Sequence, residues 1–126
     1  KAKMKARVRE LTSRRTVNDY EQWKMELKRY VVGWVNYHKL ADMGTYLQSI
    51  DEWMRRRIRM VFWKKWKRVR TRWRNLLKLG ISYRNAGILA NSRKGYWRIA
   101  ASPILKTALS NLRLEKAGFQ FFYSYY

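Results

Sequence analysis

Residues 20–41 read YEQWKMELKRYVVGWVNYHKLA, and the spacing of their apolar side chains decides the fold class. Large apolar residues return at every third or fourth position, which is the repeat of one face of an α-helix. They are Tyr20, Trp23, Leu27, Tyr30, Val31, Trp34, Tyr37 and Ala41. Asp19 and Glu21 stand where a helix dipole favours acids, and Thr16 is a candidate N-cap. Gly33 costs about 1 kcal/mol inside a helix, so we expect a close helix crossing there.

Two further helices are predicted on either side of this stretch. Residues 2–12 predict a short basic helix, and a second long helix follows a tight turn at residues 42–44. The apolar positions of this long helix are Ile50, Met54, Ile58, Val61, Phe62 and Trp66. Two candidate capping boxes start it, either Thr45 with Gln48 or Ser49 with Glu52.

The remaining elements are shorter. The alternation from Arg68 to Arg74 fits a strand as well as a helix, and we favour a helix break near Val69 followed by a helix over 71–79. Later boundaries are helix ends at Gly80, about Asn91 and Gly118, and helix starts at Ser82, Ser102–Pro103 and Asn111. The sequence therefore predicts an all-α chain: a helical bundle of two long helices plus a basic N-terminal helix, then several short helices. We place the domains at 1–80 and 81–126.

The charge is strongly one-sided. The 126 residues include 30 Lys and Arg against 8 Asp and Glu, a net charge of +22, and no acid lies between Trp53 and Arg113. Charge of one sign repels itself and works against compaction. This imbalance predicts a polyanionic partner, with nucleic acid first and an anionic membrane surface second.

Several classes of function are disfavoured. There is no cysteine, which excludes disulfides and zinc–thiolate sites, and no apolar run reaches the length of a membrane span. His38 and Asp42 would share a helix face, but nothing marks a nucleophile or oxyanion donors beside them. Asp51 and Glu52 are adjacent and point about 100° apart on a helix, which favours a capping role. We expect no enzyme activity, cofactor or metal, and a cytoplasmic fragment of a longer polypeptide.

The segment from Arg55 to Lys78 interleaves cations with tryptophans. Arginine forks bind phosphates, and tryptophan faces stack on bases. The alternative is a solvated charged face over core tryptophans, which we favour for Trp66 but not for Trp63, because Trp63 lies away from the apolar face. The predicted nucleic-acid contacts are Arg55, Arg56, Arg57, Arg59, Trp63, Lys64, Lys65, Lys67, Arg68, Arg70, Arg72, Arg74 and Lys78.

Residues 91–97 form a second candidate contact. Their small polar turn, two cations and two aromatics suit a phosphate and a stacked base, or equally a loop anchored by its aromatic rings. The candidate contacts are Asn91, Ser92, Arg93, Lys94, Tyr96 and Trp97. Residues 76–91 also resemble a helix-turn-helix, which keeps open a free-standing DNA-binding protein. A basic amphipathic membrane-surface protein is a third alternative, disfavoured because both long helices carry apolar faces wide enough to pack on each other.

Six motifs together resemble a known family. They are GWVNY at 33–37, DEW at 51–53 with RRR at 55–57, WKKWK at 63–67, TR at 71–72 with RNL at 74–76, NSRKGYW at 91–97 and SPIL at 102–105. In combination they resemble the maturase-specific domain of group II intron reverse transcriptases, over nearly the whole chain. Val69 stands where many relatives have proline, and the tail after Gly118 is less typical.

The resemblance implies a function. In this family the region follows the fingers and palm of the polymerase and forms the helical thumb, or domain X, followed by a DNA-binding segment. The thumb clamps the RNA/DNA template–primer duplex and binds the structured group II intron RNA to promote splicing. By this resemblance residues 1–80 are thumb and residues 81–126 are the DNA-binding extension. The implied partners are intron RNA, template–primer duplex, a DNA target and the fingers and palm, with no membrane. The catalytic Asp-Asp motif of the palm is absent from this sequence.

Overall fold

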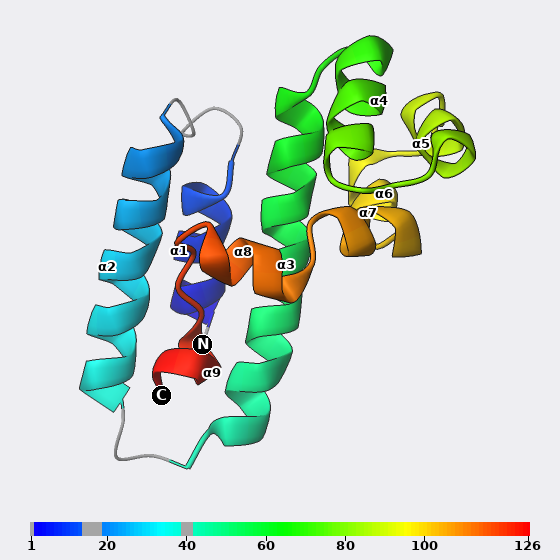
Figure 1. Ribbon diagram of the computed structural model, residues 1–126. Helices are drawn as coiled ribbons and strands as arrows, with labels where there is room; N and C mark the ends of the chain where they lie inside the picture. The colour runs from blue at the N-terminus through cyan, green and yellow to red at the C-terminus, as the bar shows by residue number, and fades with distance from the viewer. Residues whose placement is uncertain (1, 14–18, 39–41) are drawn as a thin grey trace. The chain divides into compact units, whose positions relative to one another are not determined.

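A computed structural model describes residues 2–13, 19–38 and 42–126, and the regular elements within these ranges are helices (Figure 1). The all-α prediction is confirmed. The helices are α1 (Ala2–Leu11), α2 (Tyr20–His38), α3 (Gly44–Lys65), α4 (Val69–Lys78), α5 (Tyr83–Ala90), α6 (Tyr96–Ala100), α7 (Pro103–Ala108), α8 (Asn111–Lys116) and α9 (Phe122–Tyr125).

The chain divides into two compact units. Unit 1 comprises residues 1–55 and 115–126, and unit 2 comprises residues 56–114. One division falls inside α3, so that the first half of this helix belongs to unit 1 and the second half to unit 2. The domain boundary that we placed at residue 80 stays a prediction.

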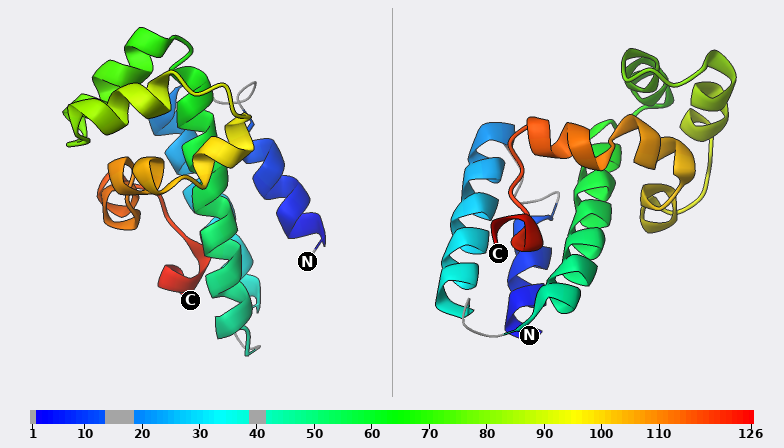
Figure 2. Two further views of the ribbon diagram at one scale, coloured as in Figure 1. Left: turned by 90° about the vertical axis from the view of Figure 1, so that its right-hand side faces the viewer. Right: turned by 60° about the horizontal axis from the view of Figure 1, so that its bottom comes forward.

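Unit 1 is built around α2. The helix buries Trp23, Leu27, Val31 and Val35, which repeat every fourth residue. Figure 2 shows α1 on one side of α2 and the first half of α3, and α9 on the other side. The aromatic tail completes this core, because Phe119, Phe121 and Phe122 are all buried. The rings of Trp23 and Phe119 meet edge to face, with 4.9 Å between their centroids.

Two predictions for α2, at Tyr37 and Gly33, need correction, while those at Thr16 and Ala41 lie outside the described residues. At the start of the helix, Asp19 Oδ1 accepts a hydrogen bond from the Glu21 N–H at 3.0 Å. Tyr37 is 86% exposed, because at 100° per residue it lies about 160° around the helix from buried Val35. Among the described residues no helix crosses at Gly33, since a Cβ placed there would meet none of their atoms within 4 Å.

The start of α3 also differs from prediction. The helix begins at Gly44, so Thr45 and Ser49 lie inside it, and Ser49 Oγ donates to the Tyr46 carbonyl. Neither capping box forms. Asp51 is a cap, but for a helix far along the chain: its carboxylate accepts from the N–H groups of Phe122 at 2.7 Å and Tyr123 at 2.9 Å. The carboxylate is buried and ties the first turn of α9 to α3.

The buried Asp51 carboxylate makes stability depend on pH. Burial raises the pKa of Asp51 above 3.8, although the Tyr123 and Phe122 N–H groups and Arg55 act in the opposite direction. An acid whose pKa is higher in the folded state holds its proton more tightly there, so its stabilising contribution is lost as pH rises from 3.8 through the folded pKa. We expect the free energy of unfolding of the native chain, relative to Asp51→Asn, to fall over that interval. Urea unfolding at a series of pH values measures this difference, and a difference independent of pH contradicts the assignment.

Unit 2 confirms most of the predicted boundaries. The helix break falls between Lys65 and Val69, and the alternating stretch that follows is helical. At the end of α4, Gly80 has φ +91, and the Ile81 N–H donates to the Leu76 carbonyl at 3.0 Å. This is the glycine-dependent helix ending that the sequence predicts. Ser82 and Ser102 cap α5 and α7 through their hydroxyl oxygens. α8 begins at Asn111 as predicted, and the Oγ of Ser110 accepts from the Arg113 N–H at its start.

Candidate nucleic-acid interface

Several arginines of unit 2 bind main-chain carbonyls. Residues 56–114 contain no Asp or Glu, so no carboxylate within the unit pairs with these guanidinium groups. The carbonyls at the C-terminal ends of helices lack partners in their own helix and carry the negative end of its dipole. They are therefore the best acceptors that the unit offers to an arginine.

Arg59 is the most deeply placed of these arginines. Its side chain is only 4% exposed. Nε donates to the carbonyl of Leu109, the C-cap of α7, at 2.8 Å, and Nη2 donates to Asn111 Oδ1 at 2.8 Å. A cation this deeply buried and this well paired is a structural residue, so the prediction that Arg59 contacts nucleic acid is not supported by its position.

Arg72 and Trp63 form a second such pair. Arg72 Nε and Nη2 lie 3.2 and 3.0 Å from the Trp63 carbonyl oxygen, and the guanidinium carbon lies 4.6 Å from the centroid of the Trp63 ring. Trp63 is 1% exposed, whereas Trp66 is half-buried. The prediction that Trp63 lies away from the core is therefore wrong: Arg72, on α4, covers its ring, so that Trp63 offers no face to a base.

Arg56 and Arg113 of unit 2 also donate hydrogen bonds to main-chain carbonyls. Both Nε and Nη2 of Arg56 donate to the Trp97 carbonyl, at 2.9 and 2.7 Å, and the guanidinium lies 3.9 Å from the Trp97 ring centroid. Arg113 Nη1 donates to the carbonyls of Leu79 and Ala108. In unit 1, Arg55 lies over the Phe121 ring at 4.8 Å. Arg57 is half-buried.

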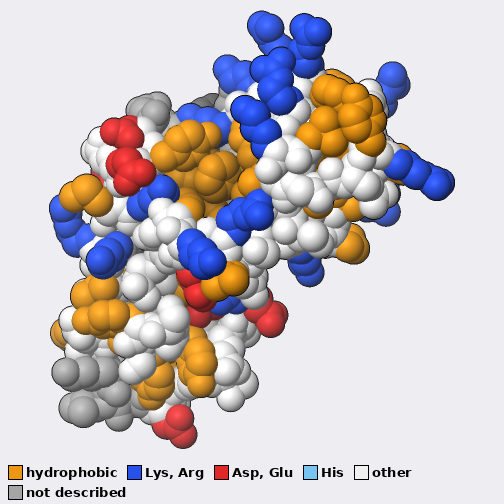
Figure 3. Space-filling view, viewed as in Figure 1, with side chains coloured by type: hydrophobic (Ala, Val, Ile, Leu, Met, Phe, Trp, Pro, Cys, Tyr) orange, Lys and Arg blue, Asp and Glu red, His pale blue; other side chains and the backbone are white. Residues whose placement is uncertain are grey.

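Exposed cations gather instead on α4. Arg70, Arg74 and Lys78, called here the α4 row, are exposed and four residues apart, so they share one helix face with a rise of about 6 Å per step. The structure gives none of the three an ion pair within unit 2, which is described in full. Exposed Lys67 and Arg68 lie just before the helix, with half-buried Lys64 and Lys65 preceding them. Figure 3 shows Lys and Arg side chains gathered over the region of α4 without Asp or Glu beside them.

The loop at 91–97 is held in place but partly open. Asn91 Nδ2 donates to the Gly87 carbonyl, and Ser92 Oγ accepts from the Lys94 N–H, so both side chains shape the turn. Arg93 and Lys94 are exposed. The rings of Tyr96 and Trp97 are also exposed, although Arg56 covers one face of Trp97 and Lys64 Nζ lies 5.3 Å from the centre of Tyr96.

His38 is held by contacts within its own helix. His38 Nδ1 lies 2.9 Å from the Trp34 carbonyl oxygen, which can only accept, and the imidazole stacks on the Trp34 ring. Within residues 2–13, 19–38 and 42–126, no three potential metal ligands gather. In the same part of the chain, no helix combines the length and the apolar character that a bilayer crossing requires.

One feature was missed from the sequence, a groove in unit 1 of about 720 Å³ between α1 and α2. Arg7 and Glu10 line it from α1, and Gly33, Trp34 and Tyr37 are among the residues that line it from α2. The unexplained helical glycine at position 33 was the available signal, and we attributed it to a helix crossing instead.

Comparison with known protein families identifies the chain. Residues 1–80 match the family described as group II intron, maturase-specific domain. No curated protein matches the chain. The matched residues include α1 through α4, with the α4 row and with Arg72, which donates to the Trp63 carbonyl near the end of α3. Because the match covers well over half of the 126 residues, the chain belongs to the group II intron maturase-specific domain family.

Proposed function

We propose that the chain is a non-catalytic nucleic-acid-binding module that binds folded group II intron RNA and promotes its splicing. The observation that carries this proposal is the α4 row, Arg70, Arg74 and Lys78, exposed in a unit that contains no carboxylate. Membership of the maturase family supports a role in intron splicing. The row supplies the chemistry: cations fixed on a helix face are ready to displace the counterions of a phosphate backbone.

Shape-based recognition fits this surface better than base reading. Double-stranded RNA hides its base edges in a deep major groove, so proteins contact mainly its phosphates and 2′-hydroxyls. A straight row of cations about 6 Å apart suits successive phosphates. Exposed Tyr83, Tyr96 and Trp97 add aromatic faces on which unpaired bases of a folded RNA stack.

The same surface suits a template–primer duplex, since the geometry of its backbone resembles that of RNA. We therefore keep the thumb assignment for residues 1–80 and the DNA-binding extension for residues 81–126 as part of the proposal. In this proposal the fingers and palm of a polymerase catalyse DNA synthesis, and this chain binds the duplex.

The second candidate is sequence-specific DNA binding by the α4–α5 hairpin. The two helices pack on each other across the Gly80 turn, and α5 exposes Arg84, Asn85 and Ile88. A recognition helix of this kind reads base edges in the major groove. Equal affinity for a duplex and its scrambled counterpart rules out this candidate.

The proposal is tested by affinity for a folded group II intron RNA and for an unrelated RNA duplex of equal length, across a salt series. Both affinities should fall steeply with salt, by a log–log slope of about 0.7 to 0.9 per phosphate contact. We expect the intron RNA to keep its advantage as salt rises, because contacts set by its fold are not all ionic. If the two affinities fall in parallel as salt rises, the chain does not recognise the intron and binds RNA only through its positive charge.

A further inference from the structure

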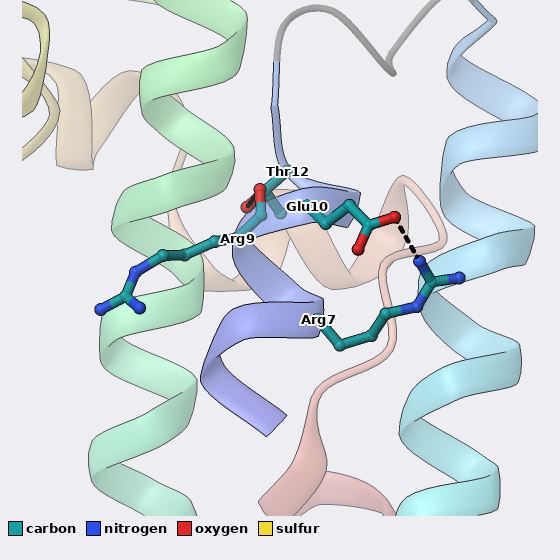
Figure 4. Close-up of polar contacts among 4 residues, drawn as sticks. All are labelled: Arg7, Arg9, Glu10 and Thr12. Atoms are coloured by element: carbon teal, nitrogen blue, oxygen red, sulfur yellow. Dashed lines mark hydrogen bonds and ion pairs between the residues drawn. The ribbon is translucent and has the colours of Figure 1, made fainter. Parts of the chain in front are cut away.

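The groove between α1 and α2 of unit 1 is large enough for a nucleotide. Its volume of about 720 Å³ lies within the range of pockets that hold small organic ligands. Figure 4 shows Arg7 and Glu10 extending from α1 toward α2, joined by an ion pair with Nη1 and Oε1 2.8 Å apart. Arg9 points away from this side, toward α3.

The α2 side of the groove is aromatic. Trp34 and His38 stack with centroids 4.1 Å apart and planes 21° apart, and Tyr37 meets His38 edge to face at 4.9 Å. Tyr30 also lines the groove, and Arg7 is close enough to oppose the rise in the pKa of Tyr30 that burial causes. Tyr37 is 86% exposed, which leaves a ring open at this groove. Such rings are stacking partners for a planar ligand.

Gly33 keeps the groove open. It stands inside α2, where glycine is disfavoured relative to alanine, and no helix in the described part of the chain crosses closely there. A Cβ at this position would meet nothing within 4 Å, although the residue lines the groove. A glycine leaves this space free, and a methyl group fits in it, whereas a long side chain at the same position would extend into the groove.

The polar groups favour a base over a phosphate group. Glu10 and Glu26 line the groove together with Arg7 and Arg29, so the lining has no excess of cations for a phosphate group. Glu26 Oε1 accepts from Gln22 Nε2 at 3.2 Å, which leaves Oε2 and further lone pairs of the carboxylate as acceptors. Arg29 adds a donor. Guanine presents adjacent N–H donors on its Watson–Crick edge and acceptors at O6 and N7, so a carboxylate and a guanidinium together suit it.

We propose that this groove binds an unstacked guanine of the RNA, with the aromatic rings stacking on the base and Glu26 accepting from its N–H donors. This inference rests on the proposed RNA-binding function and adds a base-reading site to it. Adenine lacks the N1 donor that a carboxylate requires, so the groove discriminates against it. A peptide with an apolar anchor is the competing occupant.

The test uses the lone histidine as a reporter, since His38 lines the groove and its ring protons give isolated NMR signals. The probes are guanosine monophosphate and adenosine monophosphate, each titrated into the whole chain. We expect guanosine monophosphate to shift the His38 signals and adenosine monophosphate to bind about tenfold or more weakly. Absence of a guanosine-dependent shift overturns the inference.

Two substitutions at Gly33 make the test specific. Gly33→Leu should fill the groove and abolish the shift, while the matched control Gly33→Ala should retain it, and both should raise the melting temperature because each favours helix over glycine. Glu26→Gln should reduce the guanine preference while leaving stacking intact. A folded Gly33→Leu chain that still binds guanosine monophosphate as the native chain does overturns the site.

The experiments distinguish failure of the guanine site from failure of the proposed RNA-binding function. Replacing the α4 row should weaken RNA binding but leave the His38 response to guanosine monophosphate unchanged. If the α4 row proves irrelevant to RNA while the response persists, the proposed function fails alone. If the α4 row matters but an RNA with one unpaired guanine gains nothing over its adenine counterpart, the guanine site is wrong.

Discussion

Replacing Arg70, Arg74 and Lys78 together by Gln should weaken binding of folded intron RNA by roughly 10- to 100-fold at physiological salt. The log–log dependence of affinity on salt should become shallower by about 2 to 3, because each lost cation releases about one fewer counterion. The fold should persist, since these side chains are exposed and the structure gives them no ion pair within unit 2. Fluorescence titrations at several salt concentrations measure both quantities.

The matched control removes the same charge elsewhere in unit 2. Arg84, Arg98 and Lys106 are also exposed, so their replacement by Gln lowers the net charge equally without touching the α4 row. We expect this control to lose several-fold less affinity and to keep most of the salt slope. Equal losses in the two triple variants would show that only the net charge of the chain matters, and the α4 row would then have no special role.

Local signals in the sequence were enough to predict α4, α5, α7 and the start of α8 in unit 2, but not the short α6. Gly80 ends α4 because a left-handed residue is needed there, and Ser82 and Ser102 cap their helices through contacts three residues away. Interactions over three or four residues depend on spacing alone. They can therefore be predicted without knowing which helices pack together.

Contacts between distant segments could not be predicted in this way. Asp51 caps α9 from 71 residues away, and no spacing rule connects the two. The spacing within one helix predicts that Trp63 faces away from the apolar side. The side chain is instead buried, because Arg72, on α4, covers its ring. In each case the partner is set by the tertiary fold, which the periodicity of one helix does not contain.

The arginine-rich composition was interpreted too simply for the same reason. A unit without carboxylates still needs groups to hold its helix ends, and Arg56, Arg59 and Arg72 do so by donating to carbonyls. Composition alone does not separate these residues from the α4 row. The exposure of the side chains separates the two sets. Substituting a buried arginine is expected to lower stability, whereas substituting a residue of the α4 row is expected to lower RNA affinity.

Arg59→Ala should lower the free energy of unfolding by about 3–5 kcal/mol. The substitution leaves the Leu109 carbonyl and Asn111 Oδ1 without the buried guanidinium that now donates to both at 2.8 Å, and it also opens a cavity. Arg70→Ala, on an exposed face, should change stability by no more than about 0.5 kcal/mol. Urea unfolding followed by circular dichroism compares the two variants directly.

The same comparison decides how binding data on this chain should be interpreted. An Arg59 variant is expected to lose RNA affinity because unit 2 unfolds, and that loss should vanish when binding is measured under conditions where the variant is fully folded. An Arg70 variant should lose affinity while fully folded. If Arg59→Ala costs less than about 1 kcal/mol and still abolishes binding, Arg59 contacts the RNA after all, and the division of the arginines into structural and binding sets is wrong.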